Sequence, residues 1–359
     1  MKIAFIGEAV SGFGGMETVI SEVINKLRQR HIYSEMFFFC RNDRMNKLWL
    51  KDIKYSCSFS SIRLSFLRRA KHIYALSKWF QDFQPDVVIC IDVISCLYAT
   101  KARVKSGVDV PVFSWPHFSL EHKKHAEYIT CADYHLAIST EIKWQMIKRG
   151  CPENRINVIY NSVEAKNEVI PAPAKNETAT FIYVGRIKFE GQKRVKDLLD
   201  GLSQMECNWK LHVLGDGSDL EKCQAYGRKL NIDDRVIWYG WQQHPWELIR
   251  QDIKKVTALL LTSSFEGFPM TLLEALSWGV PCISADSVSG PADIIQPDVN
   301  GHLYKPGDIS DFVVLLKKYI TGEIYIEHKE IPMSIDKFLS EKYYDRLQHI
   351  IVSACSGRI

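Results

Sequence analysis

Two glutamates eight residues apart, Glu266 and Glu274, flank a loop that leads from a predicted strand into a predicted helix. Residues 258–261 form an apolar run without polar alternation, which is typical of a parallel strand covered on both faces. Apolar residues at helical spacing follow over 271–278, so we expect a helix to begin near 269–272. The free N–H groups and the positive dipole end of such a terminus favour a bound phosphate. The two carboxylates therefore stand beside a predicted anion site.

A purely structural role for these glutamates is the alternative interpretation. Thr271 and Glu274 have the spacing of a capping box, in which the carboxylate only accepts hydrogen bonds from backbone donors. Glu266 would then be an ordinary acid in a surface loop.

Two cations occupy comparable positions earlier in the chain. Arg186 follows the predicted strand 181–184 and a glycine, and Lys193 stands where the next predicted helix begins. Both side chains should point toward the same cleft, where they would offset the charge of a diphosphate and stabilise it as a leaving group. Taken singly, each could equally be a surface cation.

The chain opens with a second phosphate-binding pattern. Residues 2–7 predict a strand, residues 12–15 are glycine-rich, and an apolar-periodic helix follows, which is the Rossmann-like order of strand, turn and helix. A dinucleotide fingerprint would require a third glycine where Glu17 stands, so a nicotinamide-dependent dehydrogenase is disfavoured.

The sequence around the two glutamates resembles a known family. The phrases Glu266-Gly-Phe-Pro, Leu-Leu-Glu274-Ala and Gly279-Val-Pro are similar to the E-x7-E motif of family-four retaining glycosyltransferases, which have the GT-B fold. The resemblance implies that Glu266 contacts hydroxyls of the donor sugar and that Glu274 binds the ribose of the sugar nucleotide. It further implies that His117, in the loop after a strand, lies near the 6-hydroxyl of that sugar.

The same resemblance assigns the remaining site residues. Arg186 and Lys193 are similar to the family's Arg and Lys pair, although the spacer is a residue longer than common, which leaves Lys188 as a competitor. Backbone amides at several turns should meet the diphosphate or the base, with an aromatic wall beside the base. These substrate-binding residues are Gly14, Gly15, Gly215, Trp241, Phe268, Met270, Thr271 and Leu272.

The implied architecture is α/β, with two Rossmann-like domains facing a central cleft. We expect residues 1–165 to form the acceptor-binding domain, 166–180 a linker rich in Ala, Pro, Asn and Lys, and 181–335 the nucleotide-sugar domain. Residues 336–359 carry a helical pattern that, by resemblance, packs back on the first domain.

Within the family, the chain looks most like enzymes of lipopolysaccharide core assembly. That likeness implies transfer of galactose from UDP-galactose to the 6-hydroxyl of a glucosyl residue, in an α-1,6 linkage and without a required metal or cofactor. A related UDP-glucose or UDP-N-acetylglucosamine transferase acting on another cell-envelope glycan is an alternative. A UDP-sugar 2-epimerase and a non-catalytic UDP-sugar-binding partner are further alternatives.

Composition bounds the setting of this activity. The chain has 359 residues, of which 46% are hydrophobic and 25% charged, and no apolar run approaches the ~18 residues that span a bilayer. We therefore expect a cytoplasmic protein that is peripheral on the inner membrane. Residues 41–78 hold ten Lys and Arg against two acidic residues, a balance that suits anionic lipid or acceptor phosphates, or else a solvated helix face. No motif supports nucleic-acid binding.

Overall fold

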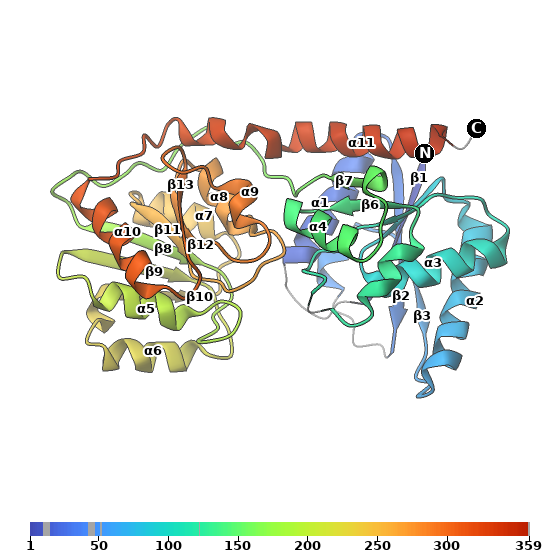
Figure 1. The fold of residues 1–359 in the computed structure, drawn as a ribbon, viewed down its shortest axis with the longest axis horizontal. Coiled ribbons are helices and arrows are strands. Elements are labelled where there is room, and N and C mark those ends of the chain that lie inside the picture. The colour runs from blue at the N-terminus through green and yellow to red at the C-terminus, as the bar shows by residue number, and fades with distance from the viewer. Residues whose placement is uncertain (10–14, 42–46, 51, 122, 358–359) are drawn as a thin grey trace. The chain divides into compact units, whose positions relative to one another are not determined.

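The computed structural model describes residues 1–9, 15–41, 47–50, 52–121 and 123–357. Its contacts divide the chain into two compact units, each described separately below. The N-terminal unit comprises Met1–Ser162 and Glu341–Ile359, and the C-terminal unit comprises Val163–Ser340 (Figure 1).

The N-terminal unit is built on a seven-stranded parallel sheet with the strand order β3-β2-β1-β4-β5-β6-β7. Its strands are β1 (Lys2–Glu8), β2 (Tyr33–Cys40), β3 (Tyr55–Phe59), β4 (Val87–Cys90), β5 (Val112–Ser114), β6 (Tyr134–Ala137) and β7 (Ile156–Val158). Its helices are α1 (Gly15–Gln29), α2 (Ser65–Phe83), α3 (Val93–Ser106), α4 (Thr140–Lys148) and α11 (Ser340–Ser356). Strand β4 is buried at every position, as its continuous apolar run predicts.

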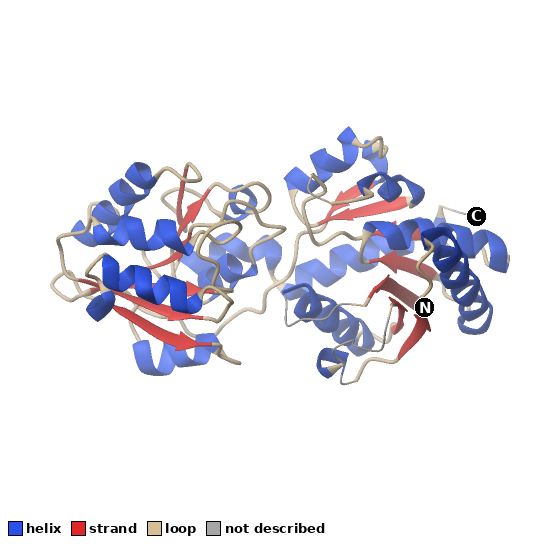
Figure 2. Cartoon of the chain, turned by 90° about the horizontal axis from the view of Figure 1, so that it is seen from below, coloured by secondary structure: helices blue, strands red, loops and turns tan. Residues whose placement is uncertain are grey.

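The C-terminal unit is built on a six-stranded parallel sheet with the order β10-β9-β8-β11-β12-β13. Its strands are β8 (Ala179–Val184), β9 (Trp209–Leu214), β10 (Val236–Gly240), β11 (Ala258–Leu261), β12 (Cys282–Ala285) and β13 (Gly301–Tyr304). Its helices are α5 (Val195–Ser203), α6 (Leu220–Lys229), α7 (Pro245–Leu248), α8 (Met270–Ser277), α9 (Pro291–Ile294) and α10 (Ile309–Thr321). Figure 2 shows helices on both faces of the strands in each unit.

Each sheet has one place where its strand order reverses. In the N-terminal unit the first strand, β1, pairs with both β2 and β4, and in the C-terminal unit the first strand, β8, pairs with both β9 and β11. Ligands of open α/β sheets bind outside the carboxyl ends of the strands at such a switch point. The two sheets confirm the predicted pair of Rossmann-like α/β domains.

The domain boundaries differ from the predicted ones. The expected linker 166–180 packs with the C-terminal unit: Ile170 is buried, its N–H donates to the carbonyl of Trp278, and its carbonyl lies 2.6 Å from Nδ1 of His328. Residues 331–338 form a 3₁₀ segment that also belongs to the C-terminal unit, so the return to the N-terminal unit begins at Glu341 rather than at 336. Composition predicts a linker here and does not reveal this packing, because individual buried side chains can hold a segment that has no periodicity.

Helix α11 is fixed to the N-terminal unit by apolar and ionic contacts. Tyr343, Tyr344 and Leu347 are buried on one face, while Arg30 pairs with Glu341 and with Asp345, at 2.8 and 2.6 Å. Within the described part of the chain, no helix has the length and apolar character needed to cross a membrane.

The basic stretch 41–78 is more structured than its composition indicates. It contains the short strand β3, which the sequence analysis does not predict, before α2 begins at Ser65. Strand β3 lies at the sheet edge, is exposed at both ends and buries only Ser58 fully, so its apolar signal is weak.

Candidate active site

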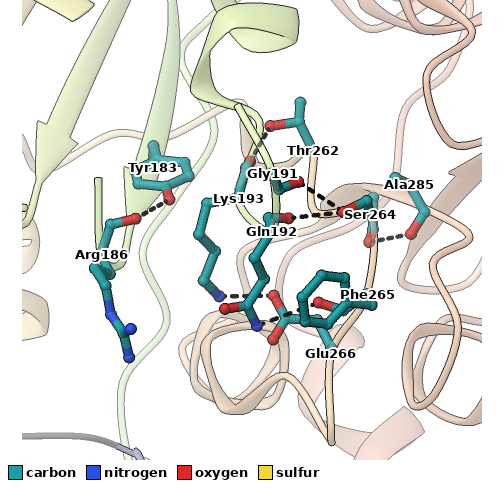
Figure 3. A network of polar contacts seen from close by, with 11 residues as sticks. Tyr183, Arg186, Gly191, Gln192, Lys193, Thr262, Ser264, Phe265, Glu266 and Ala285 are labelled. Atoms are coloured by element: carbon teal, nitrogen blue, oxygen red, sulfur yellow. Dashed lines mark hydrogen bonds and ion pairs between the residues drawn. The ribbon is translucent and has the colours of Figure 1, made fainter. Parts of the chain in front are cut away.

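A short ion pair joins two of the predicted site residues in the C-terminal unit. Nζ of Lys193 lies 2.6 Å from Oε1 of Glu266, and the two side chains are only 17% and 8% exposed (Figure 3). Lys193 precedes α5, and Glu266 stands in the loop after β11. The two residues are therefore brought together at the β8/β11 switch point from positions 73 residues apart.

Hydrogen bonds tie the loop of Lys193 to the loop of Glu266. The N–H of Ser264 donates to the carbonyl of Gln192 at 2.8 Å, and its hydroxyl donates to the carbonyl of Gly191 at 2.7 Å. The Thr262 hydroxyl donates to the carbonyl of Lys193 at 3.0 Å. These bonds fix the backbone on both sides of the ion pair, so the ammonium and carboxylate are positioned in advance.

A second loop supports Glu266 from the other side. Its N–H donates to the carbonyl of Val288 at 3.1 Å, and the Ser289 hydroxyl donates to the carbonyl of Gly267 at 2.6 Å. Gly290 follows, and a Cβ there would lie 2.5 Å from Cδ of Pro269. Local sequence patterns do not indicate the supporting roles of Val288, Ser289 and Gly290. The Ser-Gly-Pro run at 289–291 predicts a turn but does not indicate that this turn supports the loop of Glu266.

Glu274 has a specific side-chain partner. Its Oε2 accepts a hydrogen bond of 2.8 Å from the indole Nε1–H of Trp246, in helix α7. Burial raises the pKa of Glu274, against the lowering effects of this hydrogen bond and of Lys166. The alternative interpretation as a capping box is wrong: α8 starts after Pro269, with no side-chain cap among the described residues, and Glu274 is turned to Trp246.

In the turn from Phe268 to Leu272, the N–H of Leu272 donates to the carbonyl of Pro269 at 3.0 Å, so Met270 and Thr271 are the residues that can offer N–H groups to a ligand at the start of α8. The side chains of Phe268 and Leu272 are buried, the former against Phe338 at a ring-centroid distance of 5.8 Å. Met270 and Thr271 lie between them at the first turn of α8 and are half-buried. An uncapped helix start with two buried apolar anchors is suited to present N–H groups to an anion.

Arg186 lies beyond the end of β8, and Tyr183 anchors its backbone. The buried phenol donates to the carbonyl of Arg186 at 2.8 Å, and in Figure 3 the Arg186 guanidinium extends toward the same side as the Lys193 ammonium. Lys188 is engaged elsewhere, because its Nζ donates to the Ser218 hydroxyl at 2.5 Å and lies 3.7 Å from Asp219. The structure therefore favours Lys193 over Lys188 as the site lysine.

Three glycine turns meet at the carboxyl edge of this sheet. The N–H of Gly215 donates to the carbonyl of Gly240 at 2.8 Å, and a Cβ on Gly215 would lie 1.9 Å from the carbonyl oxygen of Gly185. Only a glycine permits that approach. Trp241 follows directly and is 61% exposed, so its ring is available to a ligand rather than part of the core.

His117 belongs to the N-terminal unit, in the loop after β5. Its ring lies against Trp115 with a centroid distance of 4.3 Å, and its buried Nε2 has no hydrogen-bond partner among the described residues. Burial lowers the pKa of His117 to about 3, so the imidazole is neutral near pH 7. A buried, neutral and unsatisfied ring nitrogen is suited to bind a hydroxyl group. Gly15 begins α1, while Gly14 lies outside the described residues.

Comparison with known proteins decides the family. The "Glycosyltransferase Family 4" model matches residues 13–167, and the "Glycosyl transferases group 1" model matches residues 165–332. The chain is 79% identical to the lipopolysaccharide 1,6-galactosyltransferase of Escherichia coli, over all of both chains. This chain belongs to glycosyltransferase family 4.

Solved structures agree with this glycosyltransferase fold. The apo lipopolysaccharide outer core galactosyltransferase WaaB superimposes with a TM-score of 0.94 at 61% identity, covering 99% of this chain and 100% of that one. Anabaena HepE in complex with UDP-glucose has a TM-score of 0.76 at 18% identity, covering 99% and 100%. The second likeness shows the fold alone.

The site of this glycosyltransferase combines cations, donors and two carboxylates on one sheet edge. Arg186, Lys193 and the start of α8 can neutralise and bind a diphosphate, while Glu266 and Glu274 can accept hydrogen bonds from hydroxyl groups. Among the described residues, no three His, Cys, Asp or Glu side chains come close enough together to hold a metal ion.

Proposed function

We propose that this glycosyltransferase moves galactose from UDP-galactose to the 6-hydroxyl of a glucosyl residue in the lipopolysaccharide core, in an α-1,6 linkage. One observation carries the proposal: 79% identity along the full chain to a protein named lipopolysaccharide 1,6-galactosyltransferase. The geometry of the C-terminal unit supports a sugar-diphosphate donor, because its cations and helix start converge at the β8/β11 switch point.

The donor is held by groups that the structure already positions. When the diphosphate binds, the Lys193 ammonium moves from Glu266 to the phosphate oxygens, and the N–H groups of Met270 and Thr271 and the Arg186 guanidinium complete the binding. Glu266 and Glu274 accept hydrogen bonds from the sugar and ribose hydroxyls. Gly215 and Trp241 bound the base, since the close backbone approach and the exposed ring leave room for a flat ligand.

Retention of configuration follows from attack on the face that the diphosphate leaves. The bond between the anomeric carbon and the phosphate oxygen breaks, the acceptor 6-oxygen bonds to the same carbon, and its proton passes to the departing phosphate oxygen. Retaining hydrolases instead use a nearby carboxylate as nucleophile. Glu266 pairs with Lys193 in this structure, and in the donor complex its carboxylate accepts hydrogen bonds from the sugar hydroxyls, so its role is to orient the donor. Arg186 and Lys193 stabilise the charge that builds on UDP.

The test is release of UDP from three donors: UDP-galactose, UDP-glucose and UDP-N-acetylglucosamine. Each is supplied with and without truncated lipopolysaccharide that lacks the branch galactose, and with EDTA as a further condition. We expect acceptor-dependent release from UDP-galactose alone, undiminished by EDTA, because the proposed scheme uses protein cations in place of a metal. Release from another donor alone would refute the proposed sugar, and loss of activity with EDTA would refute the metal-free scheme.

We also propose that the protein works at an anionic membrane surface, where a lipid-anchored acceptor is presented. The support is an apolar group around the start of α2, formed by Leu64, Phe66 and Leu67, of which Phe66 is 65% exposed. Apolar side chains beside basic ones suit the headgroup region of a bilayer. Phe66→Ser should weaken sedimentation with phosphatidylglycerol vesicles, while Val104→Ser, at an exposed apolar site on α3, should not. Equal binding by the two variants would reject this surface.

A further inference from the structure

A cavity of about 660 Å³ opens at the carboxyl edge of the N-terminal sheet. It lies within one unit and at the β1/β4 switch point, because Glu8 ends β1 and Asp92 lies two residues after the end of β4. Its volume is within the range of sites that enclose small ligands. Ligands of open α/β sheets bind at such a switch point, which makes this cavity a candidate binding site.

Five cations surround the opening. Arg41 follows β2, Arg68 and Arg69 lie on the first turns of α2, and Lys123 and Lys124 belong to the loop after β5. We call this cavity, with these five residues and the carboxylates Glu8 and Asp92, the basic pocket. The five cations and two carboxylates give the basic pocket a formal net charge of +3.

Glu8 and Asp92 offset only two of these five positive charges. Arg68 donates to the carbonyl of Ile62 at 2.8 Å, Arg69 donates to the Tyr128 hydroxyl at 3.2 Å, and the Lys123 ammonium lies 5.1 Å from the ring centroid of Phe118. Within the described part of the chain, none of the five forms an ion pair with a carboxylate. An excess of cations over carboxylates in a concave site favours binding of an anion.

The floor of the pocket is aromatic and uncharged. The rings of Phe39 and Tyr98 meet edge to face at 4.7 Å, and His72 lies 5.3 Å from Phe39 with its Nδ1 at 2.8 Å from the Ser58 hydroxyl. Burial, followed by Arg68, lowers the pKa of His72 to about 4, so it adds no charge near pH 7. The positive charge therefore comes from the rim alone.

The two carboxylates are built into the same pocket. Asp92 is fixed, because its Oδ2 accepts from the N–H of Glu8 at 2.7 Å and its Oδ1 accepts from the N–H and hydroxyl of Ser95, both at 2.9 Å. Burial and the charge of Asp92 raise the pKa of Glu8, against the opposing effect of Lys123. Fixed carboxylates beside cations can accept hydrogen bonds from hydroxyls of a ligand whose anionic group binds elsewhere in the pocket.

We infer that the basic pocket binds a phosphate monoester carried by the glycan acceptor, with Glu8 and Asp92 accepting hydrogen bonds from hydroxyls of the phosphorylated sugar. The inference rests on the proposed function, since it names a feature of the acceptor. Two features favour a phosphate on a glycan over a lipid headgroup. Arg68 and Arg69 line a concave site, and guanidinium groups match phosphate oxygens in paired hydrogen bonds, whereas the exposed Phe66 and Leu67 do not line the pocket.

The test compares one truncated lipopolysaccharide acceptor before and after phosphatase treatment. For the wild type we expect kcat/KM to fall about 10- to 100-fold when the phosphate is removed, the effect of losing charge-assisted hydrogen bonds. With the phosphorylated acceptor, the kcat/KM of Arg68→Gln should be lower than that of the wild type by a similar factor. With the dephosphorylated acceptor, the kcat/KM of Arg68→Gln should be close to that of the wild type. Lys78→Gln, on an exposed position of the same helix outside the pocket, should behave as wild type, and the KM for UDP-galactose should not change in either variant.

Three results would overturn the inference. The first is a wild type indifferent to the acceptor phosphate. The second is an Arg68→Gln variant that keeps the full wild-type ratio between the two acceptors. The third is an Arg68→Gln variant that loses binding to phosphatidylglycerol vesicles while keeping that ratio, which would assign the cations to lipid.

Direct binding separates this inference from the proposed function. Calorimetry with the phosphorylated acceptor, without any donor, should show weaker binding by Arg68→Gln than by Lys78→Gln even if the transferred sugar is not galactose. Failure to release UDP from UDP-galactose would then reject the donor and leave the pocket standing. Equal affinity of the two variants would reject the pocket whatever the donor.

Discussion

Breaking the Lys193–Glu266 pair from either side should give two different phenotypes. Glu266→Gln leaves a lysine that is 17% exposed without its counter-charge. Removing one partner of a buried pair costs ~3–5 kcal/mol, and the residual exposure of Lys193 favours the lower end, about 3 kcal/mol. For a domain of this size that corresponds to a fall in unfolding temperature of roughly 6–12 °C. UDP supplies a new counter-charge, so it should restore much of this loss and bind at least as tightly as to the wild type.

Lys193→Met should instead impair nucleotide binding. Loss of one charge-assisted hydrogen bond to the diphosphate is worth ~1.5–3 kcal/mol, which weakens UDP affinity about 10- to 150-fold. Both variants should lose turnover, Glu266→Gln by about 100-fold or more, because a group that orients the transferred sugar is removed. Lys188→Met is the matched control and should bind UDP as the wild type does, since Lys188 is engaged with Ser218.

Three measurements check this reasoning: thermal unfolding with and without UDP, calorimetry with UDP, and acceptor-dependent UDP release. Equal weakening of UDP binding by Glu266→Gln and Lys193→Met would refute the division of roles. Wild-type turnover in both variants would remove the pair from the active site altogether.

Three further predictions concern other parts of the structure. Trp246→Phe removes the hydrogen-bond donor to Glu274 and should weaken UDP affinity about tenfold in calorimetry. The affinity for a UDP analogue that lacks the ribose hydroxyls should change less. Equal effects on both ligands would show that Glu274 does not bind the ribose. Gly215→Ala places a Cβ 1.9 Å from a backbone oxygen and should cost ~1–3 kcal/mol in urea unfolding, whereas Gly227→Ala, in open space on α6, should gain up to about 1 kcal/mol; similar values for the two would contradict the close approach. His117 has its pKa lowered to about 3 in the folded state, so between pH 6.5 and that value the unfolded chain binds a proton that the native chain does not. The free energy of unfolding should therefore decrease as the pH is lowered through this window, by up to ~1.4 kcal/mol per pH unit. His117→Gln should reduce this pH dependence in urea titrations at pH 7 and 5. An unchanged pH dependence would show that the ring is not buried and neutral.

Much of the fold follows from local sequence patterns. The strands β1, β4, β8 and β11 are apolar runs that end in glycine or polar residues, and their order with intervening helices predicts parallel sheets. Elements with a weak local pattern are not predicted from the sequence. Strand β3 lies at a sheet edge and carries a poor apolar signal, and the segment 166–180 is held by individual contacts, such as that of the buried Ile170, rather than by a periodic face.

The residues proposed for the donor site can be chosen from the sequence, whereas the side chains and loops that they contact cannot. Glu266 and Lys193 stand at a strand end and a helix start, where sequence spacing and the family resemblance both point. Nothing in the sequence shows that Trp246 donates to Glu274, or that Ser289 supports the loop of Glu266, because each contact joins segments that only the sheet order brings together.

The basic residues of 41–78 show where sequence alone stops. Their number determined a positive surface, and with it an anionic ligand or lipid, because charge is a property of composition. Only the tertiary structure decided that Arg41, Arg68 and Arg69 surround a cavity together with Glu8, Asp92 and two lysines from a distant loop. The physical reason is that parallel strands bring their carboxyl ends to one edge whatever their separation in sequence, so a pocket there is assembled by topology.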